Sequence, residues 1–206
     1  GSYEPTGSDD VSCGNNANSF QLFSAGGIDF VFLHLACNAP DPVLAWAGDI
    51  LTRYHNRVAL LTTHMDLGIR TKPKTSEEFV SGEKGRMEWR KCFGARGNTP
   101  LQMWDKLYRK HANLSLIFSG DQSRVTALRL SQAGDHGTIV HALLSDYESS
   151  GPLRLYRFLP AQRAVQVITY DTTKHQLVER TQYVPDRAEH QFMLSDVLPD
   201  ALHGKR

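Results

Sequence analysis

The residues best suited to chemistry lie in two short polar turns, and each turn follows an apolar run. His64 and Asp66 come directly after the run 57–63. The run 114–119 leads into the second group, which comprises Asp121, Gln122, Ser123 and Arg124. Imidazole and carboxylate groups are common ligands of divalent metals, and a histidine beside a carboxylate also suits acid–base catalysis. Metal binding and proton transfer are therefore the two chemistries that these turns indicate.

A strand and a helix precede the first turn and must position it. The pattern predicts a strand at 28–35, then a helix with Asp41 as its N-cap and Pro42 in the first helical position. Apolar residues recur at helical spacing along this helix, namely Val43, Ala47, Ile50, Leu51 and Tyr54. Strand, helix and strand in this order predict a crossover unit in which 28–35 and 57–63 pair in parallel.

A second helix precedes the second turn. Its start carries a capping box, in which Thr99 and Gln102 satisfy free backbone N–H groups reciprocally, with Pro100 in the first helical position. Asn113 ends the helix, and its predicted apolar face comprises Leu101, Trp104, Leu107, Tyr108 and His111. Ligands of open α/β sheets bind at the carboxyl ends of the strands, so we expect the two turns to share one site.

Strands dominate the rest of the chain. A hairpin is predicted near the start, where Gly26 and Gly27 supply the turn between 19–24 and 28–35. The later candidates are 124–131, 137–145, 153–159 and 164–171, with weaker ones near 176–182 and 188–194.

The sequence as a whole predicts one domain of α/β, or α+β, class. We expect a layered sandwich with a strand-rich C-terminal part. The predicted organisation is a flexible segment 1–18, one domain over 19–196 and a tail over 197–206.

Charge, hydropathy and cysteine content exclude several classes of protein. A formal net charge of +1 gives no electrostatic case for binding nucleic acid. The longest apolar run, 28–37, is short and contains Asp29 and His34, so no membrane span is predicted. Three widely spaced cysteines argue against a disulfide framework and against a zinc knuckle.

A long charged segment, 68–98, follows the first turn directly. Irregular segments of this length in compact domains are usually functional or disordered. We therefore expect a lid or wall near His64, although a solvated loop remains the default reading of its lysines and arginines.

Three other histidines are poor candidates for a second site. His136 and His141 lie on a turn and a strand at a spacing of five, so they are expected to point to opposite faces. His34 alternates within an apolar strand and is expected to be a satisfied histidine of the core or sheet face.

Over roughly residues 17–195 the chain resembles the C-terminal half of a calcineurin-like metallophosphoesterase. Five stretches carry the resemblance: "NSFQLFSAGGIDFVFLHL", "ALLTTHMDLG", "WDKLYRKHANLSLIFSGDQS", "GTIVHALLSDY" and "LRLYRFLPAQRAVQVITY". The resemblance implies a layered sandwich and a two-metal centre that hydrolyses phosphoesters. It also implies that His64 is a metal ligand, and that Asp121 and Ser123 occupy the two histidine positions of a Gly-His-x-His turn.

The chain departs from this family at most of the implied ligands. The motifs of the family's N-terminal half, Asp-x-His, Gly-Asp-x-x-Asp and Gly-Asn-His-Asp/Glu, are absent, and the Gly-Asp at 48–49 falls within a predicted helix, on its surface. His64 and Asp121 remain as ligands. The resemblance thus implies manganese, iron or zinc only if a missing N-terminal half completes the site.

Three hypotheses of function follow. The first is a metallophosphoesterase-like domain that is inactive or incomplete as this chain. The second is a non-catalytic interaction module whose partner is a second copy of the chain, as a homo-oligomer, or the missing N-terminal half. The third is an unrelated α+β enzyme that uses His64 and Asp66 as an acid–base pair.

Overall fold

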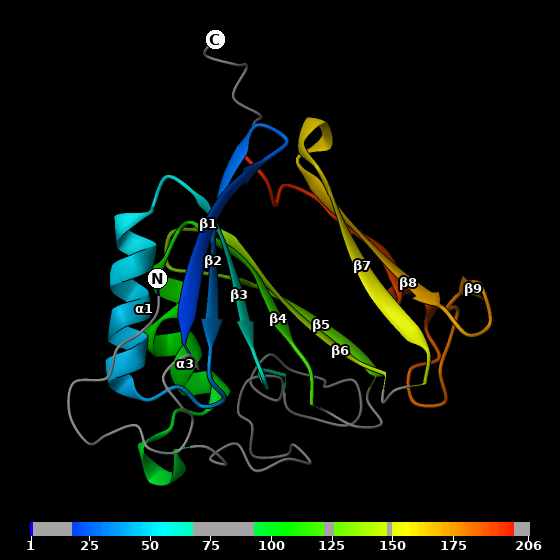
Figure 1. The fold of residues 1–206 in the computed structure, drawn as a ribbon, viewed down its shortest axis with the longest axis horizontal. Helices are drawn as coiled ribbons and strands as arrows, with labels where there is room; N and C mark the ends of the chain where they lie inside the picture. The colour runs from blue at the N-terminus through cyan, green and yellow to red at the C-terminus, as the bar shows by residue number, and fades with distance from the viewer. Residues whose placement is uncertain (2–17, 68–92, 122–125, 148–149, 200–206) are drawn as a thin grey trace.

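The computed structural model describes residues 1, 18–67, 93–121, 126–147 and 150–199. Its architecture is a sandwich of two sheets with helices on one side (Figure 1). Helices α1 (Asp41–Arg53) and α3 (Pro100–Lys106) cover one face of a six-stranded sheet, and a smaller sheet packs on the other face. The predicted mixed α/β sandwich is therefore confirmed.

The six-stranded sheet has the order β1-β2-β3-β4-β6-β5. Its strands are β1 (Ser19–Ala25), β2 (Ile28–Leu35), β3 (Val58–Thr63), β4 (Leu114–Ser119), β5 (Thr126–Ala133) and β6 (Ile139–Asp146). The four central strands are parallel and the two edge strands are antiparallel to their neighbours. The predicted crossover of β2, α1 and β3 is present, and the parallel pairing of β3 with β4 brings their carboxyl ends to one edge of the sheet.

The smaller sheet is antiparallel and comes from the C-terminal part of the chain. It has the order β10-β8-β7, and a short β9 also pairs with β8. The strands are β7 (Pro152–Leu159), β8 (Ala164–Asp171), β9 (Gln176–Leu177) and β10 (Gln191–Leu194).

The two weakest strand predictions, 176–182 and 188–194, were wrong in their extent. The first contains only the two residues of β9. The second begins later than predicted, because a 3-10 turn spans Arg187–Glu189 and the Asp186 side chain caps it by accepting from Ala188 N. A local side-chain cap thus competes successfully with strand formation.

The start of α1 differs from the prediction by one residue. Pro40 is the N-cap, with an extended backbone, and Asp41 is the first residue of the helix. The Asp41 carboxylate does not cap the helix because it accepts from Lys106 Nζ at 2.7 Å and from Asn98 Nδ2 at 2.9 Å. The predicted apolar stripe faces the core, where Val43, Ala47, Ile50 and Leu51 are buried.

The capping box of α3 is present as predicted. Thr99 Oγ1 accepts from Gln102 N at 3.3 Å, and Gln102 Oε1 accepts from Thr99 N at 2.8 Å. The helix is shorter than expected, because the backbone leaves helical geometry at Leu107 and a 3-10 turn follows. Of the predicted apolar face, Leu101 is exposed, while Met103, which we did not assign to that face, is buried.

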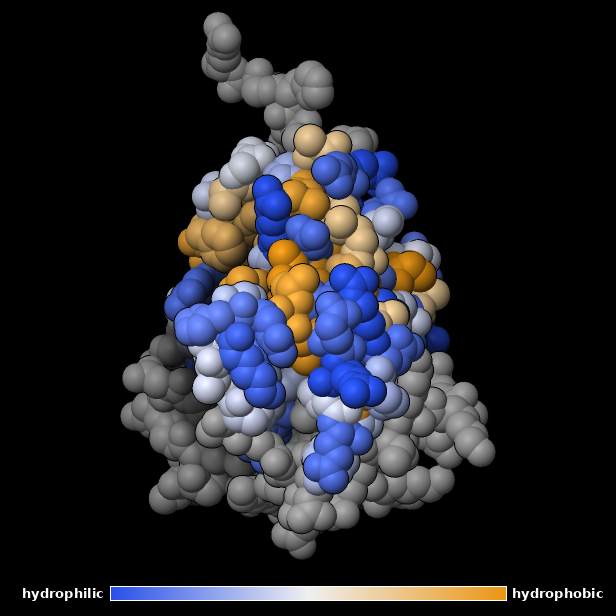
Figure 2. All heavy atoms as spheres, turned by 90° about the vertical axis from the view of Figure 1, so that its right-hand side faces the viewer, coloured by the Kyte–Doolittle hydropathy of each residue, from blue (hydrophilic) through white to orange (hydrophobic). Residues whose placement is uncertain are grey.

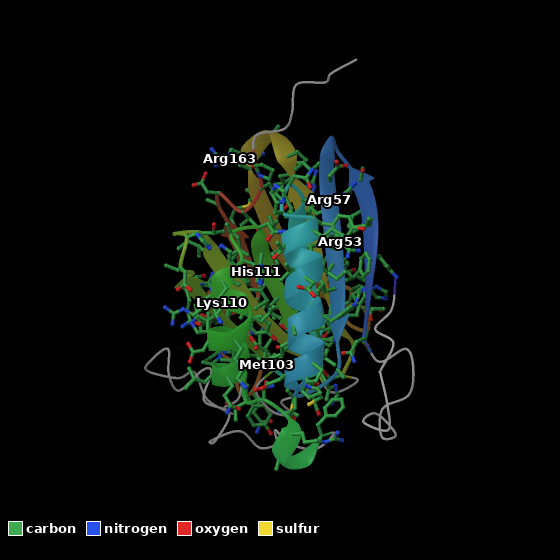
Figure 3. The ribbon with its side chains drawn as sticks, turned by 90° about the vertical axis from the view of Figure 1, so that its left-hand side faces the viewer. Arg53, Arg57, Met103, Lys110, His111 and Arg163 are labelled. Atoms are coloured by element: carbon green, nitrogen blue, oxygen red, sulfur yellow. The ribbon has the colours of Figure 1, made fainter. Side chains whose placement is uncertain are left out.

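The two helices lie side by side on the large sheet (Figure 3). Gly48 of α1 faces the segment that follows α3, where a Cβ at Gly48 would lie 3.4 Å from His111 Nε2, an ordinary contact distance. The neighbouring Asp49 is on the exposed surface of α1, as its position in the helix predicted. No helix in the described residues is long and apolar enough to cross a bilayer.

The hydrophobic core has two layers, one under the helices and one between the sheets. Val197 and Leu198, which the sequence assigned to the tail, are buried in the layer between the sheets. Asn18, at the end of the segment predicted to be flexible, is also buried, and its Oδ1 accepts from Ala36 N. Ordered structure in the described residues therefore extends at least from Asn18 to Leu198.

Candidate functional site

The two predicted ligands meet at the carboxyl edge of the large sheet. His64 directly follows β3, and Asp121 lies two residues beyond β4. Gly120 N donates to His64 O at 3.0 Å, which ties the two turns together. His64 Nε2 lies 2.5 Å from Asp121 Oδ2. We expected the turns that follow the two strands to lie together, and His64 and Asp121 do so.

The Asp121 carboxylate is the less exposed of the two groups. Its side chain is 22% exposed, against 53% for His64. Besides the short contact with His64, Asp121 Oδ2 is buried and has no aligned hydrogen bond within the described residues. The backbone of Asp121 has a φ of 52°, a left-handed conformation that aspartate tolerates better than most residues. Within the described residues, the turn therefore holds a carboxylate oxygen whose one close contact is an accessible imidazole.

Asp66, the other acidic residue of the first turn, has a different environment. Its relative exposure is 3%, and burial raises its pKa to about 7. The Asp66 charge contributes to raising the pKa of Tyr108, another buried residue, whose burial is the larger cause. The His64–Asp66 acid–base pair of our third hypothesis is not formed, because His64 pairs with Asp121 and Asp66 is buried. Asp66 therefore lies inside the protein and does not face the exposed His64 ring.

The remaining predicted site residues, Gln122, Ser123 and Arg124, lie outside the described residues, as does most of the predicted lid, 68–92. Asn98, in the part of that segment that is described, is buried and donates to Ala39 O at 2.8 Å.

The donors present fit part of a metal site and do not fit a two-metal centre. Over the described ranges, no group of three or more His, Cys, Asp or Glu side chains is placed to hold a metal ion. His64 Nε2 and Asp121 Oδ2 are two donors of suitable type. Catalytic zinc usually has three protein ligands, and two-metal sites need more. The chain as described therefore does not assemble a catalytic metal site from its own side chains.

The other histidines do not form a second cluster. His141 is buried and its Nδ1 lies 2.8 Å from Ser131 Oγ, whereas His136 is exposed and its Nε2 lies 3.2 Å from Lys110 O. Burial, with a contribution from the Arg129 charge, lowers the pKa of His141. The two side chains have separate surroundings, which agrees with the prediction that they do not act together.

His34 is satisfied at one nitrogen only. His34 Nδ1 lies 2.8 Å from Thr62 Oγ1 on the neighbouring strand. Its Nε2 is buried without a partner among the residues that the structure describes, and burial lowers the pKa of the ring. The prediction of a satisfied histidine is thus met in part.

An apolar groove between the two sheets was not predicted. Its cavity volume is about 580 Å³, and aromatic rings form much of its lining. Phe30 and Phe158 meet edge to face with ring centroids 5.7 Å apart, and Phe118 and Tyr156 do so at 4.7 Å. The available signal was the aromatic side chains at alternate positions of 28–35 and 153–159, which place them on one face of each strand.

Comparison with known proteins finds a distant relative of the chain. No protein-family model matches the chain. An uncharacterized protein of Bacillus subtilis (strain 168), YvnB, is 25% identical over 169 residues, which cover 76% of this chain. The matched part is 11% of the length of YvnB, so the chain spans a small fraction of that relative.

Proposed function

We propose that this chain is the C-terminal part of a metallophosphoesterase-like domain, related to metal-dependent phosphoester hydrolases and catalytically incomplete by itself. The observation that supports the proposal is the 2.5 Å contact between His64 Nε2 and Asp121 Oδ2. It lies at the carboxyl edge of a parallel sheet, where ligands of open α/β sheets bind.

The chemistry of this pair supports a role in metal binding. An imidazole nitrogen and a carboxylate oxygen suit manganese, iron and zinc. Within the described residues Asp121 Oδ2 has no aligned hydrogen bond, which is a further feature that a cation would use. A purely structural turn has no need for a histidine that is half exposed and points its ring nitrogen at a partly buried carboxylate.

The number of donors supports the second half of the proposal, that the chain is incomplete. In a complete site the metal ions would activate water and polarise the phosphoryl oxygens. His64 and Asp121 would be the ligands from this chain, and the other ligands would come from a preceding polypeptide segment. Because the described residues bring only these two donors together, hydrolysis by the isolated chain is not expected.

Metal content and phosphatase activity test this proposal together. We expect the purified chain to contain much less than one metal per molecule and to show no turnover of an aryl phosphate, with or without added manganese. His64→Ala is expected to leave this background unchanged, as is the control His136→Ala on an exposed histidine elsewhere. Stoichiometric metal with turnover that His64→Ala abolishes would overturn the claim that the chain is incomplete.

A second candidate function is that of an interaction module, and the outer face of the small sheet favours it. Figure 2 shows a stripe of apolar residues on this face. Leu153, Leu155 and Met193 are 53%, 47% and 44% exposed there. Exposed apolar patches of this kind often mark protein–protein contacts. The partner in this reading is a second copy of the chain or another polypeptide segment.

A further inference from the structure

The groove between the sheets lies beside an open edge of the small sheet. Among the described residues, β7 pairs with β8 only, so its other side has no strand neighbour. β7 begins its return close to the β1–β2 turn, where a Cβ at Gly26 would be 3.0 Å from Pro160 Cγ. Toward its other end β7 moves away from β1 and β2 and lies nearer to β6, where Arg154 Nη1 donates to Leu144 O at 3.2 Å (Figure 1). The inner face of the large sheet thus extends beyond the cover that β7 provides.

Alternate residues of β7 face this groove. The lining from β7 comprises Arg154, Leu155, Tyr156 and Phe158, while Phe32 and Phe118 line the groove from the large sheet. Along β7, Arg154, Tyr156 and Phe158 are buried or partly buried, whereas Leu155 is exposed, so the alternate three are the ones directed inward. Side chains that alternate between buried and exposed positions are expected of a strand with one face directed inward. A strand placed next to β7 would therefore also direct every second side chain into the groove.

The polar groups around the groove are already used within the protein. The Arg154 guanidinium is buried and donates to Leu144 O, Thr169 Oγ1, Tyr147 Oη and Glu189 O. The Thr62 hydroxyl is bonded to His34 Nδ1. Among the described residues that line the groove, Arg154 is the cation, and its guanidinium already donates to these four acceptors, so the groove favours apolar groups over an anion.

We propose that an extended peptide segment from outside these 206 residues adds to the free edge of β7 as a further strand, with alternate apolar side chains in the groove. Addition of a strand to an exposed edge combines main-chain hydrogen bonds with pockets for every second side chain. The inference does not depend on metal binding by His64 and Asp121.

The size of the groove suits this occupant. Eight residues along the length of β7 direct about four side chains to one face. A volume of about 580 Å³ divided among four side chains leaves about 145 Å³ for each. A cavity of about 150 Å³ holds a benzene molecule, so each position accepts a large apolar side chain.

The length of YvnB indicates where such a segment would come from. The part of YvnB that matches this chain is 11% of its length, so that protein has much more polypeptide outside the matched region than within it. The occupant in this proposal is therefore a strand supplied by polypeptide beyond this chain. A second copy of the chain and a small apolar molecule are the alternatives that the experiment must separate.

Selection from a random library of ten-residue displayed peptides on the full chain provides the probe. We expect the enriched peptides to alternate apolar and polar residues, and one of them, made synthetically, to bind in a fluorescence anisotropy titration. Phe32→Gln is expected to weaken its binding by about tenfold or more. The matched control is Leu101→Gln, an exposed apolar residue of α3 on the helix side of the large sheet, which is expected to bind as the unchanged chain does.

Two further readouts separate strand addition from apolar partitioning. Hydrogen exchange of alternate β7 amides is expected to slow when the peptide binds, because they acquire main-chain partners. N-methylation of the peptide amides that face β7 is expected to abolish binding. N-methylation of the amides on the opposite edge of the peptide is expected to leave binding unchanged. Thermal unfolding of Phe32→Gln checks that the variant is folded, and the methylated peptides test the proposal without any change to the chain.

Several results would overturn the proposal. The first is a selection that enriches no peptide, and the second is enriched peptides that do not alternate apolar and polar residues. The third is peptide binding that neither Phe32→Gln nor N-methylation changes. Binding of an apolar dye to the groove without any peptide binding would assign the groove to small molecules. If the chain forms dimers at low micromolar concentration and these bury the β7 amides, the partner of the β7 edge is a second copy of the chain.

Discussion

His64 and Asp66 are two residues apart in one turn, yet they lie in opposite environments. His64 is half exposed and contacts Asp121, whereas Asp66 is buried and its pKa is raised to about 7. The sequence identified the turn as a site for chemistry, because a histidine and acids follow an apolar run. It did not show which acid would pair with His64, since the direction of each side chain depends on how the two turns pack.

Burial of Asp66 predicts a specific pH dependence of stability. The folded-state pKa is above the ordinary 3.8, so between these values the folded chain holds a proton that the unfolded chain has lost. Stability therefore falls as pH rises through this window and levels off above about pH 7. The loss between pH 5 and pH 8 is up to about 3 kcal/mol, since each pKa unit is worth about 1.4 kcal/mol.

Urea unfolding of the chain and of Asp66→Asn at pH 5 and pH 8 measures this effect. The variant is expected to lose less stability than the unchanged chain between the two pH values, because its side chain does not titrate. The two proteins responding identically to pH would show that Asp66 is ionised in the folded protein.

The elements that carry the candidate site were largely predictable, and their ends were less so. The α1 stripe and the α3 capping box come from local patterns, and both are present. The errors are at positions where tertiary contacts or local caps intervene. Asp41 is bonded to Lys106 and Asn98 in place of capping its helix, and the predicted strand 188–194 begins late because of a capped 3-10 turn.

The capping box of α3 is expected to contribute to stability, because the helix has only seven residues. Thr99→Ala removes the acceptor for Gln102 N and should lower the free energy of unfolding by about 1 kcal/mol. Thr99→Ser keeps the hydroxyl and should cost much less. Urea unfolding measures both variants, and an equal loss for the two would mean that the Thr99 methyl group, and not the cap, is what stabilises the protein.

At the scale of the whole molecule, the parallel core of the large sheet was predictable but the stacking of the sheets was not. Strand, helix and strand order implied the β2–β3 crossover. In contrast, β7 has apolar residues on both faces, with Tyr156 and Phe158 inside and Leu153, which is 53% exposed, outside. Its pattern therefore did not indicate which face would be buried, and the groove followed only from the three-dimensional arrangement.

The outer face of the small sheet predicts self-association. We expect light scattering of the chain at high concentration to show dimers or larger species, because Leu153 and Leu155 leave apolar area exposed to water. The double variant Leu153→Lys with Leu155→Lys should shift the chain toward monomer. Ile139→Lys, which replaces an apolar residue that is 44% exposed on another strand, is the matched control and should not. A monomer at every concentration would rule out this surface as a contact between copies.

The metal ligand role of His64 and Asp121 is tested most directly by NMR of the His64 ring during a zinc titration. We predict a saturable shift of the His64 signals that requires zinc in large excess, because the described residues place only two donors together. Asp121→Ala should abolish that shift while the zinc response of the exposed His136 stays the same. A His64 ring that does not respond to zinc, or that responds equally without the Asp121 carboxylate, would contradict the account.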